Sequence, residues 1–187
     1  MSQWFICFLF YSLGGYGLEK IHARLSRSPR QVRKCFLILP LCPVYGLAMV
    51  LFIAAVPEDT GFFARMLLGG MICTGVEYLV HLFYDKALGV WFWDYTAMRG
   101  NFHGRVCPHF TIIWGFLSAV SVRIFQPLVI LLAQITPAWI TYALWLVLAA
   151  DCVLSAALLR RFRNTELLTV SAVSAQIRAS SQSSTSL

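Results

Sequence analysis

The chain has 187 residues and a formal net charge of +7, and 59% of its residues are hydrophobic while only 12% are charged. Soluble domains are about 45–50% apolar and about 25% charged, so this composition excludes a water-soluble fold. Too few charged residues remain to cover the surface of a globule of this size. The first partner that the sequence predicts is therefore the lipid bilayer.

Five apolar stretches are long enough to cross a hydrocarbon core of about 30 Å, which takes about 20 helical residues. Because backbone amides in lipid must bond within their own segment, we expect an all-α, polytopic membrane helix bundle. The stretches run approximately over residues 4–21, 36–56, 62–84, 110–135 and 139–159. We expect residues 1–163 to form a single membrane domain and the polar stretch 164–187 to be a mobile cytoplasmic tail.

Basic residues are distributed unevenly among the connections between these stretches. With five spans, 13 of the 15 Lys and Arg fall on one side, within residues 20–34, 85–109 and 160–178. The positive-inside rule then predicts a multi-pass protein of the cell (inner) membrane, with its amino terminus outside and its carboxyl terminus in the cytoplasm. The net charge is thus explained by topology, and we expect no nucleic-acid partner.

The second predicted helix contains two prolines, Pro40 and Pro43, three residues apart. Each removes a backbone donor and clashes with the preceding helical turn, so this helix should be broken between Pro40 and Gly46. Broken helices at membrane depth are tolerated where they are buried or line a cavity, and transporters use them as binding sites. The alternative is a kink that serves packing alone.

Two glutamates are predicted to lie inside the hydrocarbon core, where a charged side chain is unfavourable. Glu19 and Glu77 each follow the outer end of an inward-running stretch by 15 residues, about 22 Å of helix, and Asp151 lies near the same inner half of the membrane. Glycines at 14–17 and 69–75 should let the first and third helices approach and bring Glu19 and Glu77 together. A buried polar site is the interpretation we favour, since a charge here costs at least about 2.5–3.5 kcal/mol. Carboxyls satisfied within the bundle, without a ligand, are the alternative.

The long connection before the fourth helix is dense in aromatic and polar residues. Interfacial aromatics argue against disorder, so we expect a short re-entrant or interfacial element. Within it Asp94 can pair with Arg105, with Asn101 and His103 nearby. No nucleophile and base are arranged for catalysis, which favours a structural network over chemistry.

Metal and nucleotide chemistry find little support in the sequence. A carboxyl and an imidazole share a helical face at Glu19-x-x-His22 and at Glu77-x-x-x-His81, but a metal-binding bundle repeats Glu-x-x-His and adds two further glutamates. We therefore expect no metal and no cofactor. The Walker pattern G-x-x-x-x-G-K-[ST] is missing from the sequence, so any ATP would be bound by another chain. Whether the protein is itself an enzyme stays open.

Six ordered blocks within about residues 5–125 carry a resemblance to a known family. They are Phe10-Tyr11-Ser12-x-x-Gly15-x-x-x-Glu19, Cys42-Pro43-Val44-Tyr45-Gly46, Glu77-Tyr78, Trp91-x-Trp93-Asp94-Tyr95, Asn101-x-x-Gly104-Arg105-Val106-Cys107 and Trp114-Gly115. In these blocks the chain resembles the Putative ABC-transporter type IV family, the CmpB-like permeases. The resemblance implies a membrane permease that works with a separate ATPase subunit.

The leading hypothesis is a small permease that moves or binds a small or lipid-like substrate at a polar site open to the cytoplasm. One alternative is a membrane-embedded enzyme or binding protein for lipids or envelope precursors. Another is a structural partner subunit, and a homo-oligomer is compatible with each. The candidate ligand-binding residues are Glu19, Cys42, Pro43, Tyr45, Glu77, Tyr78, Trp93, Asp94, Tyr95, Asn101 and Arg105.

Overall fold

The computed structural model describes residues 2–25 and 35–168, and within these ranges the regular secondary structure is helical, with no strand. The helices are α1 (Ser2–Leu25), α2 (Pro43–Ala55), α3 (Phe62–Phe83), α4 (Pro108–Ile135) and α5 (Ala138–Phe162). A π-helical turn over Tyr84–Leu88 continues α3, and a 3₁₀ turn over Thr165–Leu167 follows α5. The predicted all-α fold is confirmed. Residues 169–187, most of the predicted tail, lie outside the described residues.

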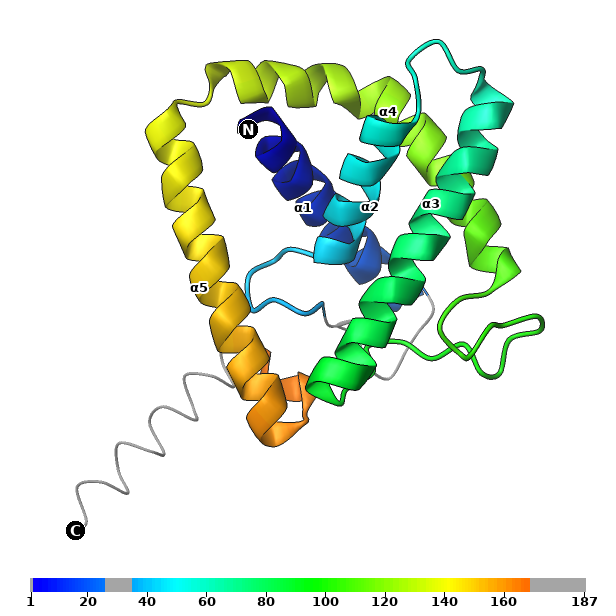
Figure 1. The fold of residues 1–187 in the computed structure, drawn as a ribbon, viewed down its shortest axis with the longest axis vertical. Coiled ribbons are helices and arrows are strands. Elements are labelled where there is room, and N and C mark those ends of the chain that lie inside the picture. Colours follow the sequence, from blue (N-terminus) through cyan, green and yellow to red (C-terminus); the bar gives the residue numbers. More distant parts are fainter. Residues whose placement is uncertain (1, 26–34, 169–187) are drawn as a thin grey trace.

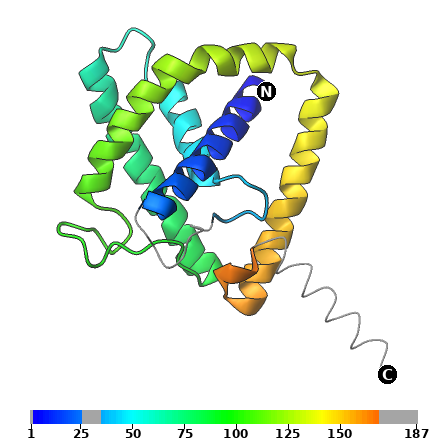
Figure 2. The ribbon, with the colours of Figure 1, turned by 180° about the vertical axis from the view of Figure 1, so that it is seen from behind.

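Successive helices alternate in direction (Figure 1). The carboxyl ends of α1, α3 and α5 and the loop 89–107 lie toward one end of the bundle, and the connections α2–α3 and α4–α5 lie toward the other. The view from behind shows α1 crossing in front of α2, with α4 along one side and bending over the far end (Figure 2). We call the end that holds the loop 89–107 the loop end.

Three helical stretches are long and apolar enough to cross a membrane, namely 62–88, 108–135 and 138–162. The 13 residues of α2 rise only about 20 Å, less than the hydrocarbon core of about 30 Å. An α2 of this length can reach across the core only together with the irregular segment that precedes it. The number of helices that cross the bilayer, five by our prediction, stays a prediction beyond these three.

The predicted helix over 36–56 is wrong in its first part. Residues 35–42 are not helical, and α2 begins at Pro43. Pro43 occupies the first turn of α2, where a missing N–H costs nothing and the fixed φ suits a helix, whereas Pro40 would clash with any turn before it. The break therefore precedes Pro43, and Tyr45 and Gly46 lie inside the helix.

The third buried carboxylate, Asp151 of α5, explains how an irregular segment is tolerated at this depth. The backbone N–H of Ile38 donates to Asp151 Oδ1 at 3.3 Å and that of Leu39 donates to Oδ2 at 3.1 Å. The hydroxyl of Ser155, one turn further along α5, also donates to Oδ1 at 3.3 Å. Because non-helical backbone in a membrane must find partners elsewhere in the protein, Asp151 supplies the acceptors that the broken helix lacks.

Glycines do bring helices close together, but not the pair we predicted. A Cβ on Gly15 of α1 would lie 2.3 Å from the ring of Tyr45 in α2, and one on Gly70 of α3 would lie 2.9 Å from the Thr111 carbonyl oxygen in α4. Thus α1 packs against α2 and α4, and α3 packs against the same two helices. The predicted direct approach of the first and third helices is wrong, since α2 and α4 lie between them.

Candidate binding cavity

A cavity of about 650 Å³ is lined mainly by residues of α1 and α4, and α2 and α3 contribute the rest of its helical lining. Residues from all four helices line it, among them Gly14, Gly17 and Glu19 of α1, Tyr45 and Met49 of α2, Cys73 and Glu77 of α3, and Trp114 and Ser118 of α4. The broken segment and the π-helical turn add Cys35, Phe36, Cys42 and Tyr84. A space of this size lies within the range of about 300–1,000 Å³ typical of ligand pockets.

Glu19 reaches the cavity from α1 and is only 8% exposed. The hydroxyl of Tyr45 donates to Glu19 Oε1 at 2.7 Å. The ring of Tyr45 fits against α1 only because Gly15, one turn before Glu19, has no side chain to obstruct it. The local sequence of α1 therefore fixes both the carboxylate and the position of its phenolic donor.

Glu77 reaches the cavity from α3 and is only 6% exposed. The Tyr95 hydroxyl donates to Oε1 at 3.0 Å and the Trp114 indole donates from Nε1 to Oε2 at 3.0 Å. The indole N–H can only donate, so Oε2 of Glu77 acts as an acceptor. Tyr95 belongs to the loop 89–107, so this loop returns into the bundle to complete the surroundings of Glu77.

The two glutamates are connected along one wall of the cavity. The rings of Tyr45 and Trp114 meet edge to face with centroids 5.4 Å apart, and each ring carries the donor to one of the two carboxylates. Aromatic pairs prefer this arrangement. We call Glu19, Tyr45, Trp114 and Glu77 the carboxylate wall. Two aromatic side chains therefore link Glu19 to Glu77, whose helices do not pack directly against each other.

Aromatic and apolar groups make up most of the remaining lining. Beside the carboxylate wall the cavity is lined by Phe10, Tyr11, Phe36, Tyr84, Phe92, Trp93 and Phe125. None of the described lining residues is a Lys, Arg or His. Its rim on α1 and α4 consists of apolar side chains on the outer surface, Leu13, Ile21 and Ile124, which are 53%, 55% and 60% exposed.

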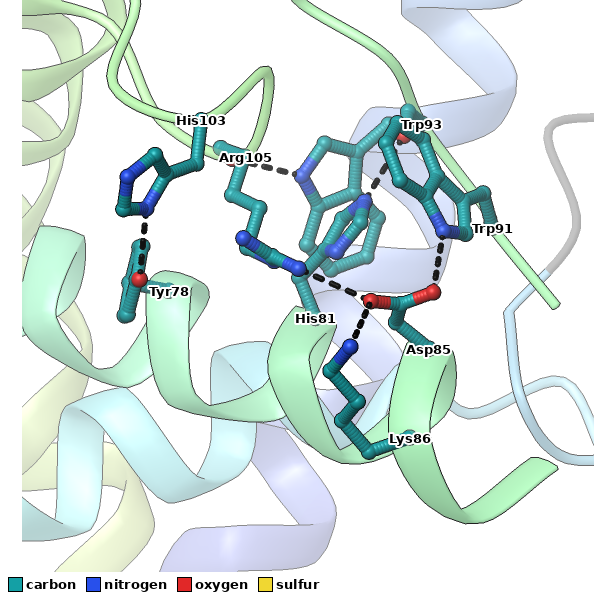
Figure 3. Close-up of polar contacts among 8 residues, drawn as sticks. All are labelled: Tyr78, His81, Asp85, Lys86, Trp91, Trp93, His103 and Arg105. Atoms are coloured by element: carbon teal, nitrogen blue, oxygen red, sulfur yellow. Dashed lines mark hydrogen bonds and ion pairs between the residues drawn. The ribbon is translucent and has the colours of Figure 1, made fainter. Parts of the chain in front are cut away.

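A second polar group forms at the loop end, outside the cavity (Figure 3). Asp85 Oδ1 accepts from Trp91 Nε1 at 2.7 Å, and Asp85 Oδ2 accepts from Arg105 Nη2 at 2.8 Å. Lys86 Nζ lies 3.8 Å from the same Oδ2. The predicted pairing of Asp94 with Arg105 is wrong, because the last turn of the α3 region offers Asp85 to Arg105 instead.

Asp94 and Asn101 stabilise the loop itself. The Thr96 N–H donates to Asp94 Oδ1 at 2.9 Å and lowers the pKa of this carboxyl below its ordinary value. Asn101 donates to the carbonyl oxygens of Thr96 and Met98, and its own Oδ1 accepts from the Gly104 N–H at 2.9 Å. These contacts hold the backbone of the loop, and a role of Asp94 and Asn101 in ligand binding stays a prediction.

Trp93 joins the loop to both α3 and the cavity. Its carbonyl oxygen lies 3.0 Å from Nε2 of the fully buried His81, so that nitrogen carries the proton, because a carbonyl only accepts. Its indole N–H donates to the Arg105 carbonyl at 2.9 Å (Figure 3). The Trp93 side chain also lines the cavity, so the loop forms part of the cavity wall at the loop end. Nearby, Tyr78 and His103 share a hydrogen bond of 2.9 Å between the hydroxyl and Nδ1.

The structure divides the predicted site residues into two groups. Those that line the cavity are Glu19, Cys42, Tyr45, Glu77 and Trp93, and Tyr95 contacts Glu77. Those outside the lining are Pro43, Tyr78, Asp94, Asn101 and Arg105, which begin α2 or stabilise the loop end. Sequence reasoning did not select Trp114 or Asp85. A tryptophan within an apolar helix, whose N–H needs a buried partner, was the signal available for Trp114.

Comparison with known proteins gives one result. The model of the family described as Putative ABC-transporter type IV matches residues 6–156, which include all of α2, α3 and α4 and most of α1 and α5. No curated protein and no solved structure matches the chain.

Proposed function

Because the chain belongs to the Putative ABC-transporter type IV family, we propose that it is the membrane-spanning, permease-type subunit of a transporter. In this proposal the cavity between α1 and α4 binds a small or lipid-like substrate, and the carboxylate wall is its polar anchor. The loop end faces the cytoplasm, and the protein lies in the cell (inner) membrane.

The observation that carries the proposal is the cavity with two buried carboxylates, Glu19 and Glu77, among apolar helices. Ionisable groups at membrane depth cost at least about 2.5–3.5 kcal/mol each and are found mainly along substrate and ion pathways. Among the described residues, Asp151 accepts from the backbone of the broken segment, whereas Glu19 and Glu77 accept from aromatic side chains on the cavity wall. A role in substrate binding would explain why two carboxylates lie in this cavity.

Energy for transport would come from a separate ATPase. The sequence has no Walker pattern, so nucleotide binding and hydrolysis need another chain. The loop 89–107 is the surface we assign to this partner, because the Asp85–Arg105 pair and the Trp93 contacts connect it to α3 and to the cavity. A shift of the loop would move Tyr95 and so change its hydrogen bond to Glu77.

Gentle-detergent affinity purification of the tagged chain, with mass spectrometry of the proteins and lipids that accompany it, tests the proposal. We expect an ATPase chain in a stoichiometric amount, and the native mass of the complex will show whether two copies of this chain are present. Enrichment of one lipid or precursor without any ATPase would contradict the transporter role and favour the alternative of a lipid-binding protein.

The proposed orientation has its own test. A cysteine introduced in place of the exposed Asp59, between α2 and α3, should react with a membrane-impermeant thiol reagent added from outside the cell. The unsubstituted chain is the control for the six native cysteines, of which five are buried. Labelling of position 59 only from the cytoplasmic side would reverse the orientation.

A further inference from the structure

We propose that the cavity binds one hydrocarbon chain of a membrane lipid, with the headgroup at the loop end and the chain running along α1. This inference deepens the proposed function and rests on it, because it names the class of the substrate. It follows from the composition of the lining, from the length of the cavity along α1 and from its open side between α1 and α4.

The composition of the lining is the first argument. Aliphatic and aromatic side chains form most of it, among them Phe10, Leu18, Val44, Ala48, Met49, Leu117 and Val120. The Tyr11 hydroxyl already donates to Gln126 Oε1 at 3.1 Å. The Ser118 hydroxyl donates to the Gly115 carbonyl oxygen at 3.0 Å. A polar molecule would lose its water in this part of the cavity without gaining new partners there, whereas a hydrocarbon chain loses nothing.

The length of the cavity is the second argument. One face of α1 lines it, formed by residues that recur at intervals of three and four, namely Phe10, Leu13, Gly14, Gly17, Leu18 and Ile21. This face extends over about 16 Å of helix, and half of a hydrocarbon core of about 30 Å is about 15 Å. The cavity is therefore about as long as one leaflet of the bilayer is thick, which is the length of one lipid chain.

The two ends of this face differ, and the difference orients the lipid. At one end Phe10 contacts Phe125 of α4, with ring centroids 6.0 Å apart. Toward the other end, where α1 approaches the loop end (Figure 1), the lining includes Glu19 and also Trp93 from the loop 89–107. Because polar groups gather at the loop end and apolar rings at the opposite end, the headgroup belongs at the loop end and the end of the chain near Phe10.

The open side is the third argument. Leu13, Ile21 and Ile124 are more than half exposed on the surface that apolar helices turn to the bilayer. Gly14 and Gly17, which also line the cavity, have nothing within 4 Å of the position where a Cβ would stand. A lipid chain therefore enters the cavity from the bilayer on the α1 side without crossing a polar surface.

The experiment uses the purified full-length chain in nanodiscs of phosphatidylethanolamine and phosphatidylglycerol, with a fraction of each lipid carrying a photoactivatable diazirine on its chain. Irradiation attaches the lipid to the side chains that the diazirine contacts, and mass spectrometry of peptides locates them. Met49 and Cys73 line the cavity and are only 7% and 9% exposed, so a lipid outside the cavity does not reach them. We expect labelling of both, and of Leu146 of α5, which is 74% exposed and reports the surrounding lipid.

Two glycine variants test whether the open side admits the chain. Gly17→Leu places a side chain where the structure has open space, so α1 should still fold, and labelling of Met49 and Cys73 should fall at least about fivefold because the cavity is crowded. Gly75→Leu is the matched control, because Gly75 of α3 also has nothing within 4 Å of its Cβ position and is not among the described lining residues. It should leave labelling of all three residues unchanged.

The position of the diazirine on the chain tests the orientation. Met49 packs with Cys7 and Tyr11 away from the loop end, whereas Trp93 packs against the cluster of Tyr84 and Leu159 at the loop end. A diazirine at the end of the chain should therefore label Met49 more than Trp93, and a diazirine beside the headgroup should label Trp93 more than Met49. The reverse order would overturn the orientation.

Two further results would overturn the inference. They are labelling of Leu146 without labelling of Met49 and Cys73, and equal labelling of Met49 and Cys73 in Gly17→Leu and Gly75→Leu. Thermal unfolding of both variants shows whether lost labelling reflects lost folding. The transporter role fails separately, by the absence of an ATPase on purification, so an unlabelled cavity in a chain that still binds an ATPase would reject only the lipid chain.

Discussion

Asp151 and Glu77 are both buried carboxylates in apolar helices, 8% and 6% exposed, yet their surroundings differ in kind. Asp151 accepts from two backbone N–H groups of the broken segment and from Ser155 of its own helix, and it does not line the cavity. Glu77 accepts from the side chains of Tyr95 and Trp114 and faces the cavity. Asp151 supplies hydrogen-bond acceptors to the backbone of the broken segment, whereas Glu77 is part of the cavity lining.

The comparison indicates that one buried carboxylate can stabilise the fold while another contributes to binding. Backbone donors cannot move away without unfolding the segment, so the Asp151 contacts are permanent parts of the fold. Side-chain donors such as Tyr95, which comes from a loop, can rotate or shift and leave room for a ligand. We therefore expect changes at Asp151 to appear in stability, and changes at the carboxylate wall to appear in binding.

The largest expected effect is that of Asp151→Ala. The change leaves two partly buried N–H groups, those of Ile38 and Leu39, without their acceptors and should lower the free energy of unfolding by about 2–4 kcal/mol. Asp151→Asn keeps one acceptor oxygen and should lose less. Thermal unfolding in detergent measures both. Equal stability of the Ala variant and the unsubstituted chain would break the comparison, because Asp151 would then not hold the segment.

Gly15→Ala should have the next largest effect. Its Cβ would lie 2.3 Å from the Tyr45 ring, which has to move away from Glu19, and overpacking of this kind costs about 1–3 kcal/mol. Gly14→Ala is the matched control on the same helix, since nothing lies within 4 Å of its Cβ. It should be neutral or stabilising by up to about 1 kcal/mol through helix propensity. An equal loss of stability in the two variants would contradict this account, because the loss would then not depend on the position of Tyr45.

A smaller effect is expected for Arg105→Gln at the loop end. The change removes the hydrogen-bonded ion pair with Asp85, so the loop 89–107 should open more often. Hydrogen exchange at loop amides such as that of Tyr95, which donates to the Gly104 carbonyl, should become about threefold to tenfold faster. Unchanged exchange would mean that Trp93 and His81 hold the loop without Arg105.

The smallest effect is predicted for Asp94→Asn. An asparagine Oδ1 can accept from the Thr96 N–H as the carboxylate does, so loop exchange rates should stay within about twofold of the unsubstituted chain. This variant is therefore the control for Arg105→Gln within the same loop. A larger effect in Asp94→Asn than in Arg105→Gln would restore the pairing that the sequence suggested.

The helices and the costly carboxylates were predictable from the sequence, because lipid imposes strong rules on length, apolar composition and buried charge. Glu19 and Glu77 were selected on these grounds, and both line the cavity. The broken second helix was also predictable from its prolines, although its position was not. Pro43 can begin a helix as well as end one, and only the acceptors offered by Asp151, more than a hundred residues away, decide between the two.

The remaining differences concern partners that are distant in sequence. The sequence suggested Asp94 as the partner of Arg105, but the π-helical turn places Asp85 beside the loop, where Arg105 reaches it. Gly15 indicated a close helix contact without saying which helix it meets. Trp114 became part of the site only when α4 packed against α3 and brought its N–H to Glu77. Spacing along one helix does not contain this information.

The most direct test of the central claim measures, in parallel for Glu77→Gln and Asp151→Asn, the stability of the chain and the lipids or small molecules that it retains on gentle-detergent purification. Glu77→Gln should retain less of any compound that the unsubstituted chain retains, with a smaller loss of stability than Asp151→Asn. Asp151→Asn should unfold at a lower temperature and, where still folded, retain the compound as the unsubstituted chain does. Loss of stability alone in both variants would contradict the claim, because Glu77 would then be a structural carboxylate like Asp151.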